Sequence, residues 1–431
     1  MTNPSQTQPQ YRLIYDIALL AGEIMLQNGA ETYRVEDTIT RILSISGFAS
    51  TEAFVTITGI FVTLEDPTLD QPLTTVRRVH THTTNLHKIS IVNDISRKLV
   101  SGSLSLEDAK STLVSLKSLS TYPWPLLLLT YSLVCGLFTI LFNGSPRDFA
   151  SSCVTGVLLG ILVLALDHLR IPRFMKDFAS SVLIGFSGVL LVYTLGLGEY
   201  LDPIIIGALM PLVPGIAITN AVRDTLNGDY LSGVAQGVEA ALIAISIAAG
   251  VSLVLHFYAF TPLSPMAPAE TVYWFSFGRE WPISPDILFQ TACAFGASLG
   301  FSILFNASRS HLICCGIAGA CSWFVYAVTL QLGVSSLMAN FIAVLALSIL
   351  TGHLARFKKA PITVFLAPGI IPLVPGAGMY RTMFFIFGGE YAMGGRTFIE
   401  TMEIAAILAV GIAIHYSFGQ IWRQIRTHRA K

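Results

Sequence analysis

The sequence predicts a polytopic α-helical membrane protein of about ten transmembrane helices, built as two inverted five-helix repeats, with a small cytoplasmic α+β domain at the N-terminus. Three observations predict this fold class. Of the 431 residues, 53% are hydrophobic and only 12% are charged, and the mean hydropathy is +0.65. Apolar runs long enough to cross a bilayer recur from Pro123 onward. The phrase Pro-Leu-Val-Pro-Gly occurs twice, at Pro211–Gly215 and Pro372–Gly376.

Residues 1–121 are expected to form the soluble domain, because they contain no long apolar run. Helical spacing of apolar residues, alternation of β-branched residues and turn signals predict its elements. In order, these are two helices over Tyr11–Ser46 divided at Gly29, a hairpin over 51–66 turning near Thr58-Gly59, a third strand at 73–80, and helices at 85–101 and 105–119. The first ten residues are polar, so no secretory signal is expected.

The membrane part is predicted to contain two blocks of five spans. The first block, 122–257, holds apolar runs near 125–142, 149–169, 178–197, 203–221 and 231–257. The second block, 285–420, holds runs near 285–305, 311–331, 335–355, 361–379 and 398–418. A Pro-rich external linker at 258–284 separates the blocks, and 421–431 reads as a basic cytoplasmic tail.

The two blocks are related by an internal repeat at an offset of 161 (372 − 211). At this offset Gly228 matches Gly389, Glu239 matches Glu400 and Gly250 matches Gly411. Phe142–Ser145 (FNGS) also meets Phe305–Ser308 (FNAS), two residues out of phase. Five is an odd number of spans, so the second block must be inverted relative to the first, as in many secondary transporters.

The distribution of basic residues predicts that both termini are cytoplasmic. With the N-terminus inside, the inner loops and tail contain twelve Lys and Arg residues: Arg170, Arg173, Lys176, Arg223, Arg309, Arg356, Lys358, Lys359, Arg423, Arg426, Arg429 and Lys431. The outer loops contain four: Arg147, Arg279, Arg381 and Arg396. We therefore expect a multi-pass protein of the plasma membrane.

The two Pro-Gly phrases are the strongest candidates for a substrate site. Each proline lacks an N–H and clashes with the carbonyl four residues earlier, so the fourth and ninth spans are expected to break. Freed backbone groups at membrane depth are tolerated against protein or a water-filled cavity, and half-helix ends suit a zwitterionic amino acid. The alternative is a simple proline kink in a packed helix.

Two acidic residues occupy repeat-equivalent places inside spans, Glu239 and Glu400. Acids in spans are costly and suggest a role as proton carrier or partner of a cation. If the spans begin later than drawn, these acids instead lie at the membrane interface. The full set of candidate substrate-binding and coupling residues is Pro211, Pro214, Gly215, Asn220, Glu239, Pro372, Pro375, Gly376, Tyr380 and Glu400. Arg223, Asp224 and Arg381 are interpreted as gate or interface residues.

The soluble domain shows no clear chemical site. His80, His82 and His87 are close in sequence, but no further ligand is in register, so solvent-facing histidines are favoured over a metal site. The segment Gly29–Asp37 (GAETYRVED) is interpreted as a solvated helix face with an ion pair. No P-loop, nucleophile elbow or dinucleotide fingerprint occurs, which favours a secondary transporter over an ATPase or enzyme. No catalytic residue, metal or cofactor is expected.

Four segments resemble the threonine/serine exporter family: GAETYRVEDTITRI (29–42), NLHKISIVNDISRKLVSG (85–102), MPLVPGIAITNAVRDTLNGDYLSG (210–233) and FLAPGIIPLVPGAGMYR (365–381). The resemblance covers nearly the whole chain. It implies export of small polar metabolites across the plasma membrane. It also implies kinship with a split bacterial pair associated with succinate export. The family's N-terminal domain has been likened to hydrolases, but no catalytic constellation here supports that activity.

Two classes of function therefore remain open. The favoured one is a secondary, proton-coupled exporter of threonine, serine or similar amino acids, with a dicarboxylate such as succinate as the alternative substrate. The other is a membrane-anchored enzyme or ligand sensor whose N-terminal domain carries the activity. The expected partners are the small-molecule substrate, the coupling proton and the lipid bilayer, without nucleic acid; a homo-oligomer is left open.

Overall fold

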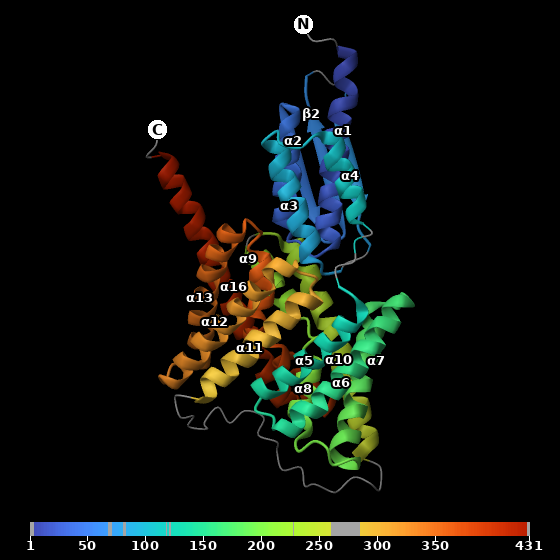
Figure 1. The fold of residues 1–431 in the computed structure, drawn as a ribbon, viewed down its shortest axis with the longest axis vertical. Helices are drawn as coiled ribbons and strands as arrows, with labels where there is room; N and C mark the ends of the chain where they lie inside the picture. Colours follow the sequence, from blue (N-terminus) through green and yellow to red (C-terminus); the bar gives the residue numbers. More distant parts are fainter. Residues whose placement is uncertain are drawn as a thin grey trace. The chain divides into compact units, whose positions relative to one another are not determined.

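A computed structural model describes residues 4–67, 71–80, 83–117, 119, 122–226, 228–259 and 285–428. The chain divides into two compact units (Figure 1). The first, here called the domain unit, comprises Met1–Tyr122 together with two later segments, Phe305–His311 and Leu354–Val364. The second, here called the membrane unit, comprises Pro123–Leu304, Leu312–His353 and Phe365–Lys431. Inclusion of two distant loops in the domain unit is not apparent from the sequence.

The domain unit is a three-stranded antiparallel sheet with helices packed against it. Its elements are α1 (Pro4–Gln27), α2 (Thr32–Leu43), the 3-10 turn η1 (Ser44–Ser46), β1 (Ser50–Thr56), β2 (Gly59–Glu65), β3 (Leu73–Arg78), α3 (Leu86–Val100) and α4 (Leu106–Leu116). The strand order is β1-β2-β3. Helix α1 contacts α2, α3 and α4, and α1 and α2 contact the sheet. The predicted hairpin, third strand and four helices are confirmed.

Local signals explain these elements. Gly29 has a φ of +86°, which ends α1 and separates it from α2. Along β2, Ile60, Val62 and Leu64 are buried whereas Phe61 is exposed, as the two-residue period of a strand requires. The Asn85 side chain caps α3 by accepting a hydrogen bond from the Lys88 N–H at 3.0 Å.

The membrane unit is almost entirely helical. Its helices begin with α5 (Trp124–Leu141), α6 (Pro146–His168), α7 (Arg173–Val189), the π-helical turn η2 (Leu190–Thr194), α8 (Leu201–Leu209), α9 (Gly215–Leu226) and α10 (Tyr230–Ala259). They continue with α11 (Pro285–Leu304), the 3-10 turn η3 (Arg309–His311), α12 (Leu312–Gln331), α13 (Ser336–Lys358), α14 (Thr363–Ile370), the 3-10 turn η4 (Ile371–Leu373), α15 (Gly376–Phe387) and α16 (Tyr391–His428). Three elements in this sequence, η3 and the ends of α13 and α14, contribute to the domain unit.

In the described part of the chain, eight helices are long and apolar enough to cross a membrane. A ninth candidate consists of Thr363–Leu373 and Gly376–Phe387, which meet at a bend of 51°. The chain is therefore a mostly helical, multi-pass membrane protein. The run expected at 203–221 forms two short helices, α8 and α9. The expected linker 258–284 lies outside the described residues beyond Ala259.

Three helices extend beyond the expected spans. Helix α7 begins at Arg173, not near 178, because Pro172 occupies its N-cap and the preceding turn ends there. Helix α15 continues to Phe387, so Arg381 lies within a helix and not in an outer loop. Helix α16 is also longer than the expected span and continues to His428.

Packing within the membrane unit repeats from one half of the chain to the other. Gly250 of α10 packs on Phe178 and Ser181 of α7, where an added Cβ would lie 2.1 Å from the Ser181 Oγ. Gly411 of α16 packs on Phe341 and Val344 of α13, at 2.3 Å from the Val344 Cγ1. These contacts involve equivalent positions, since 411 − 250 is 161 and both 341 − 178 and 344 − 181 are 163.

Candidate functional site

Each Pro-Leu-Val-Pro-Gly phrase interrupts a helix, as predicted. Helix α8 ends at Leu209 and α9 begins at Gly215, and the residues between them are not α-helical. In the second copy α14 gives way to the 3-10 turn η4, and α15 begins at Gly376. Prolines cannot supply the N–H that would continue the helix, so both interruptions follow from the sequence.

Equivalent carbonyls before the two breaks receive donors from neighbouring helices. The Cys135 Sγ of α5 lies 3.8 Å from the Ala208 carbonyl oxygen. The Ser322 Oγ of α12 donates to the Gly369 carbonyl at 2.8 Å. Ala208 and Gly369 are repeat-equivalent, since 369 − 208 is 161. These two carbonyls directly follow those of Gly207 and Pro368, which Pro211 and Pro372 leave without the helical donor four residues later. The breaks are thus built into the packing of adjacent helices.

The two breaks touch each other. A Cβ added to Gly376 would lie 2.4 Å from the Val213 Cγ1, so the second phrase packs its glycine directly on the first. Ala377 and Tyr380 of α15 belong to the same buried cluster as Leu209 and Leu212 before the first break. The two copies of the phrase, which are offset by 161 residues, are therefore brought together at one place. A simple kink in an isolated helix does not explain this.

The packing around the breaks is reciprocal. Helix α15, which follows the second break, contacts α10, and its counterpart α9 contacts α16. Ala244 of α10 and its equivalent Ala405 of α16 share one buried cluster with Ile218 of α9. The two copies of the helix pair therefore exchange partners around the breaks.

The candidate prolines and glycines lie at the two breaks, and they differ in how far they are buried. Pro214, Pro372 and Gly376 are buried, whereas Pro211 and Pro375 are partly buried. Tyr380 is only 4% exposed and packs its ring 5.9 Å from that of Phe384. Asn220 lies on α9 and is partly buried, and Gly215 is the first residue of α9.

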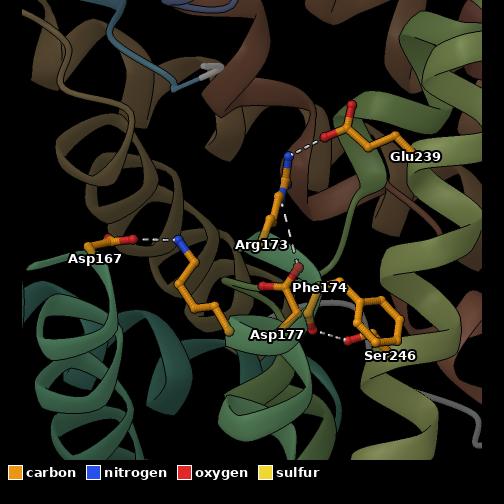
Figure 2. A network of polar contacts seen from close by, with 7 residues as sticks. Asp167, Arg173, Phe174, Asp177, Glu239 and Ser246 are labelled. Carbon is orange, nitrogen blue, oxygen red and sulfur yellow. Dashed lines mark hydrogen bonds and ion pairs between the residues drawn. The ribbon is translucent and has the colours of Figure 1, made fainter. Parts of the chain in front are cut away.

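Glu239 lies in an ionic network between α10 and α7. Its Oε1 is 2.6 Å from the Arg173 Nη1, and Arg173 also approaches Asp177, with 3.8 Å between Nε and Oδ2. Figure 2 shows Arg173 between the carboxylates of Glu239 and Asp177. In a second ion pair the Lys176 Nζ is 2.7 Å from the Asp167 Oδ1. The Ser246 Oγ donates to the Phe174 carbonyl at 2.9 Å and joins the same two helices. Glu239 is 38% exposed and has a cationic partner.

Glu400 has a different environment from Glu239. It is 57% exposed and pairs with Arg396 one turn earlier on α16, at 3.0 Å between Nε and Oε1. Both acids are five residues before the alanines that meet in the shared cluster, Ala244 and Ala405, a distance of about 7.5 Å along each helix. The ion pairs of the two acids, with Arg173 and Arg396, lie outside the Pro-Gly phrases.

Three charged residues of the membrane unit were not recognised as site candidates. Asp177 is only 3% exposed although it carries a carboxylate. Asp202, in the first turn of α8, interacts electrostatically with Arg381 of α15 and with Tyr380 beside it. Proline before α7 could have placed Asp177 inside a helix, but no local signal pairs Asp202 with Arg381, which are far apart in sequence.

One interpretation of the soluble domain is wrong. The segment Gly29–Asp37 is not a solvated face, because Glu31 is buried and Glu36 accepts a hydrogen bond from the Val55 N–H at 2.8 Å. Arg34 donates from Nη1 to the Thr363 Oγ1 at 3.0 Å, so it joins α2 to the start of α14 inside the domain unit. Asp37 forms a surface ion pair with Arg41, which lies four residues later and outside this segment, in place of the expected i, i+3 pair.

The histidines do not form a site together. His80 is exposed and His87 is partly buried, while His82 lies outside the described residues. Among the residues that the structure describes, no three His, Cys, Asp or Glu side chains are grouped so as to hold a metal ion.

Comparison with protein families covers both halves of the chain. A model described as "Putative threonine/serine exporter" matches residues 16–258, and one described as "Threonine/Serine exporter, ThrE" matches residues 290–418. The chain belongs to the threonine/serine exporter family. The first match includes the Pro211–Gly215 break and the second includes Pro372–Gly376. No solved structure matches the chain.

Relatives match either nearly the whole chain or a part of it. The threonine/serine exporter of Corynebacterium glutamicum is 25% identical over 414 residues, which are 93% of this chain and 81% of the relative. The "Probable threonine/serine exporter" of Mycobacterium tuberculosis is 21% identical over 425 residues, 94% and 76% of the two chains. The "Probable succinate transporter subunit YjjP" of Escherichia coli is 26% identical over 255 residues, 58% of this chain and 96% of that subunit.

Proposed function

We propose that this chain is a secondary, proton-coupled exporter of threonine, serine or similar small amino acids across the plasma membrane. The observation that carries the proposal is the direct contact of the two Pro-Gly breaks, in a chain whose two halves both match exporter families. Discontinuous helices that meet near the middle of a repeat pair are the usual place of substrate binding in secondary transporters. The exporter names of two relatives that span almost the whole chain support the substrate class.

The architecture that we propose is ten spans in two inverted repeats with both termini cytoplasmic. Counting α8–α9 and α14–α15 as one span each raises the eight long helices to ten (8 + 1 + 1). Reciprocal contacts support the twofold relation: α15 with α10 and α9 with α16, and also α5 with α11. In the last pair Gly300 packs on Val134 while Gly296 packs on Leu137. The loops of the domain unit, Phe305–His311 and Leu354–Val364, are both predicted to be inside, as the N-terminus is.

This topology is testable by cysteine labelling. In a chain freed of its own six cysteines, Leu197→Cys, or a cysteine placed within 260–284, should react with a membrane-impermeant maleimide in intact cells. Leu169→Cys, which is similarly exposed, should react only after permeabilisation. Labelling of Leu197→Cys only after permeabilisation would overturn both the orientation and the inversion.

At the proposed site, different groups of the protein bind the carboxylate and the ammonium group of a zwitterionic amino acid. Helices α9 and α15 begin at Gly215 and Gly376, and the positive ends of their dipoles favour the substrate carboxylate. Freed carbonyls before the breaks favour the ammonium group. We assign substrate contact to this region, with Asn220 and Tyr380 as polar neighbours, and proton coupling to Glu239 and Glu400. The pairing of Glu239 and Asp177 with a single arginine supports a place that takes up a proton, since one carboxylate remains uncompensated.

Counterflow in proteoliposomes tests the function directly. Vesicles preloaded with unlabelled threonine or serine should accumulate much more labelled threonine than vesicles preloaded with buffer that contains no amino acid. A parallel panel with succinate examines the second candidate, which the succinate-transporter subunit relatives and the cationic Arg381 near the breaks favour. Exchange of succinate without threonine or serine would replace our substrate assignment; exchange of none of these would reject it.

A further inference from the structure

The N-terminal domain grips the loop between α11 and α12. The N–H groups of Leu86 and His87, in the first turn of α3, donate to the Phe305 and Asn306 carbonyls at 2.9 and 3.0 Å. The Asn306 side chain donates back to the Thr84 carbonyl at 3.3 Å. The first N–H groups of a helix have no partner within the helix, so this loop fills a binding place that α3 leaves open.

A second residue of the domain reinforces the same contact. The Tyr122 hydroxyl donates to the Ala307 carbonyl at 2.6 Å and is buried with it. The Arg309 guanidinium lies over the Tyr122 ring, 6.0 Å from its centre. Four positions of the loop, Phe305, Asn306, Ala307 and Arg309, are therefore held by backbone and side-chain groups of the domain.

The domain also holds the loop between α13 and α14. Arg34 of α2 donates to the Thr363 Oγ1 at 3.0 Å, at the first residue of α14. His311, at the end of the first loop, interacts electrostatically with Lys358 of the second loop and with His87 of α3. Burial lowers the pKa of the His87 imidazole, which keeps it neutral beside these basic groups. Helix α14 runs directly into the second Pro-Gly break, so this loop is joined to the proposed site by one short helix.

The equivalent loop of the first repeat is held in another way. Asn143 and Asn306 are equivalent and both have a positive φ, +65° and +52°. Within the first repeat Asp148 ties this loop to the segment before α8, since its Oδ1 accepts from the Glu199 and Tyr200 N–H groups at 2.7 and 3.0 Å. In the second repeat His311 stands at the position of Asp148 (311 − 148 = 163) and cannot accept in the same manner.

We propose that the N-terminal domain is a clamp that ties the α11–α12 loop to the α13–α14 loop, replacing the tie that Asp148 makes in the first repeat, and that export requires this clamp to stay closed. The domain thereby acts as a structural part of the exporter and not as a separate enzyme. The expected effect of the clamp on export rests on the proposed function, whereas its expected effect on hydrogen exchange does not.

Weakening the clamp should speed hydrogen exchange at one place and reduce export. The variant Arg34→Gln/Tyr122→Phe/Asn306→Gly removes three side-chain bonds, retains the tyrosine ring and keeps the positive φ accessible. Amides in peptides that cover Leu86 and His87 should exchange at least about tenfold faster, because each lost bond favours opening. Asn143→Gly is the matched control, because Asn143 has the same backbone conformation at the equivalent position of the other repeat. Unchanged protection of Leu86 and His87, or wild-type export despite faster exchange, would reject the clamp.

A covalent cross-link across the clamp tests whether the clamp stays closed or opens during transport. Thr84→Cys and Asn306→Cys in a chain freed of native cysteines can be joined by a short thiol cross-linker. The joined chain should retain export close to that of the same chain before cross-linking. Loss of export on joining, restored by cleavage of the linker, would show that the clamp opens during transport and would overturn the proposal. If the wild type exports no tested substrate, the function fails, and exchange protection alone then decides whether the clamp exists.

Discussion

Replacement of Gly376 by valine is expected to abolish export. The added Cβ alone would lie 2.4 Å from the Val213 Cγ1, and the two γ-methyl groups require still more room. Leu212, next to Val213, and Ala377, next to Gly376, are buried. The collision must therefore move one helix break away from the other. Overpacking of this kind costs about 1–3 kcal/mol and displaces the surrounding backbone. Gly376 does not have a positive φ, so the backbone itself accepts a side chain and the effect is one of space.

A second-site change should rescue the smaller substitution. Gly376→Ala introduces only the Cβ, and Val213→Ala removes the Cγ1 that it meets. We expect Gly376→Ala to lower the counterflow rate by about tenfold or more, and the double variant to recover most of it. Gly395→Ala is the control, because this helical glycine of α16 has nothing within 4 Å of an added Cβ. Wild-type counterflow by Gly376→Val would show that contact between the breaks is not needed for export.

Features that depend on a short stretch of sequence could be predicted. The hairpin turns at Thr58-Gly59 because the alternation and the glycine are adjacent, and both helix breaks follow from prolines that no neighbour can compensate for. The repeat predicts an interruption in each half, and the structure adds that the two interruptions meet where Gly376 lies against Val213.

Features that depend on distant partners could not be predicted in the same way. Arg34 reads as a surface residue at helical spacing, yet its partner Thr363 is 329 positions away. Glu36 accepts a hydrogen bond from the Val55 N–H on the edge strand β1, and no sequence pattern reveals this donor. Asp177 was missed for another reason, because charged residues near the start of an apolar run were assigned to the loop. Pro172 in the N-cap was the available signal.

Removal of Arg173 is expected to impair export more than removal of either acid that it contacts. In Arg173→Gln the buried Asp177 loses its nearest cation and Glu239 loses the partner at 2.6 Å. The remaining local charges are then Lys176 against three carboxylates, those of Asp167, Asp177 and Glu239. A broken buried pair costs several kcal/mol, but Arg173 is half exposed and screened by solvent, so about 2–3 kcal/mol is the expected loss in stability.

The same network tests which acid carries the proton. If Glu239 has this role, Glu239→Gln should flatten the pH dependence of counterflow while the protein still reaches the membrane, because the amide keeps hydrogen bonding but cannot titrate. If both repeats carry a coupling proton, Glu400→Gln should flatten the pH dependence in the same way. If they do not, this variant loses only the exposed ion pair with Arg396. Asp177→Asn in the Arg173→Gln background should restore expression by removing the uncompensated buried charge. Wild-type rates and pH profiles in Glu239→Gln, Glu400→Gln and their double variant would assign the coupling proton elsewhere, with Asp177 as the next acid to examine, since it shares the same arginine and is almost fully buried.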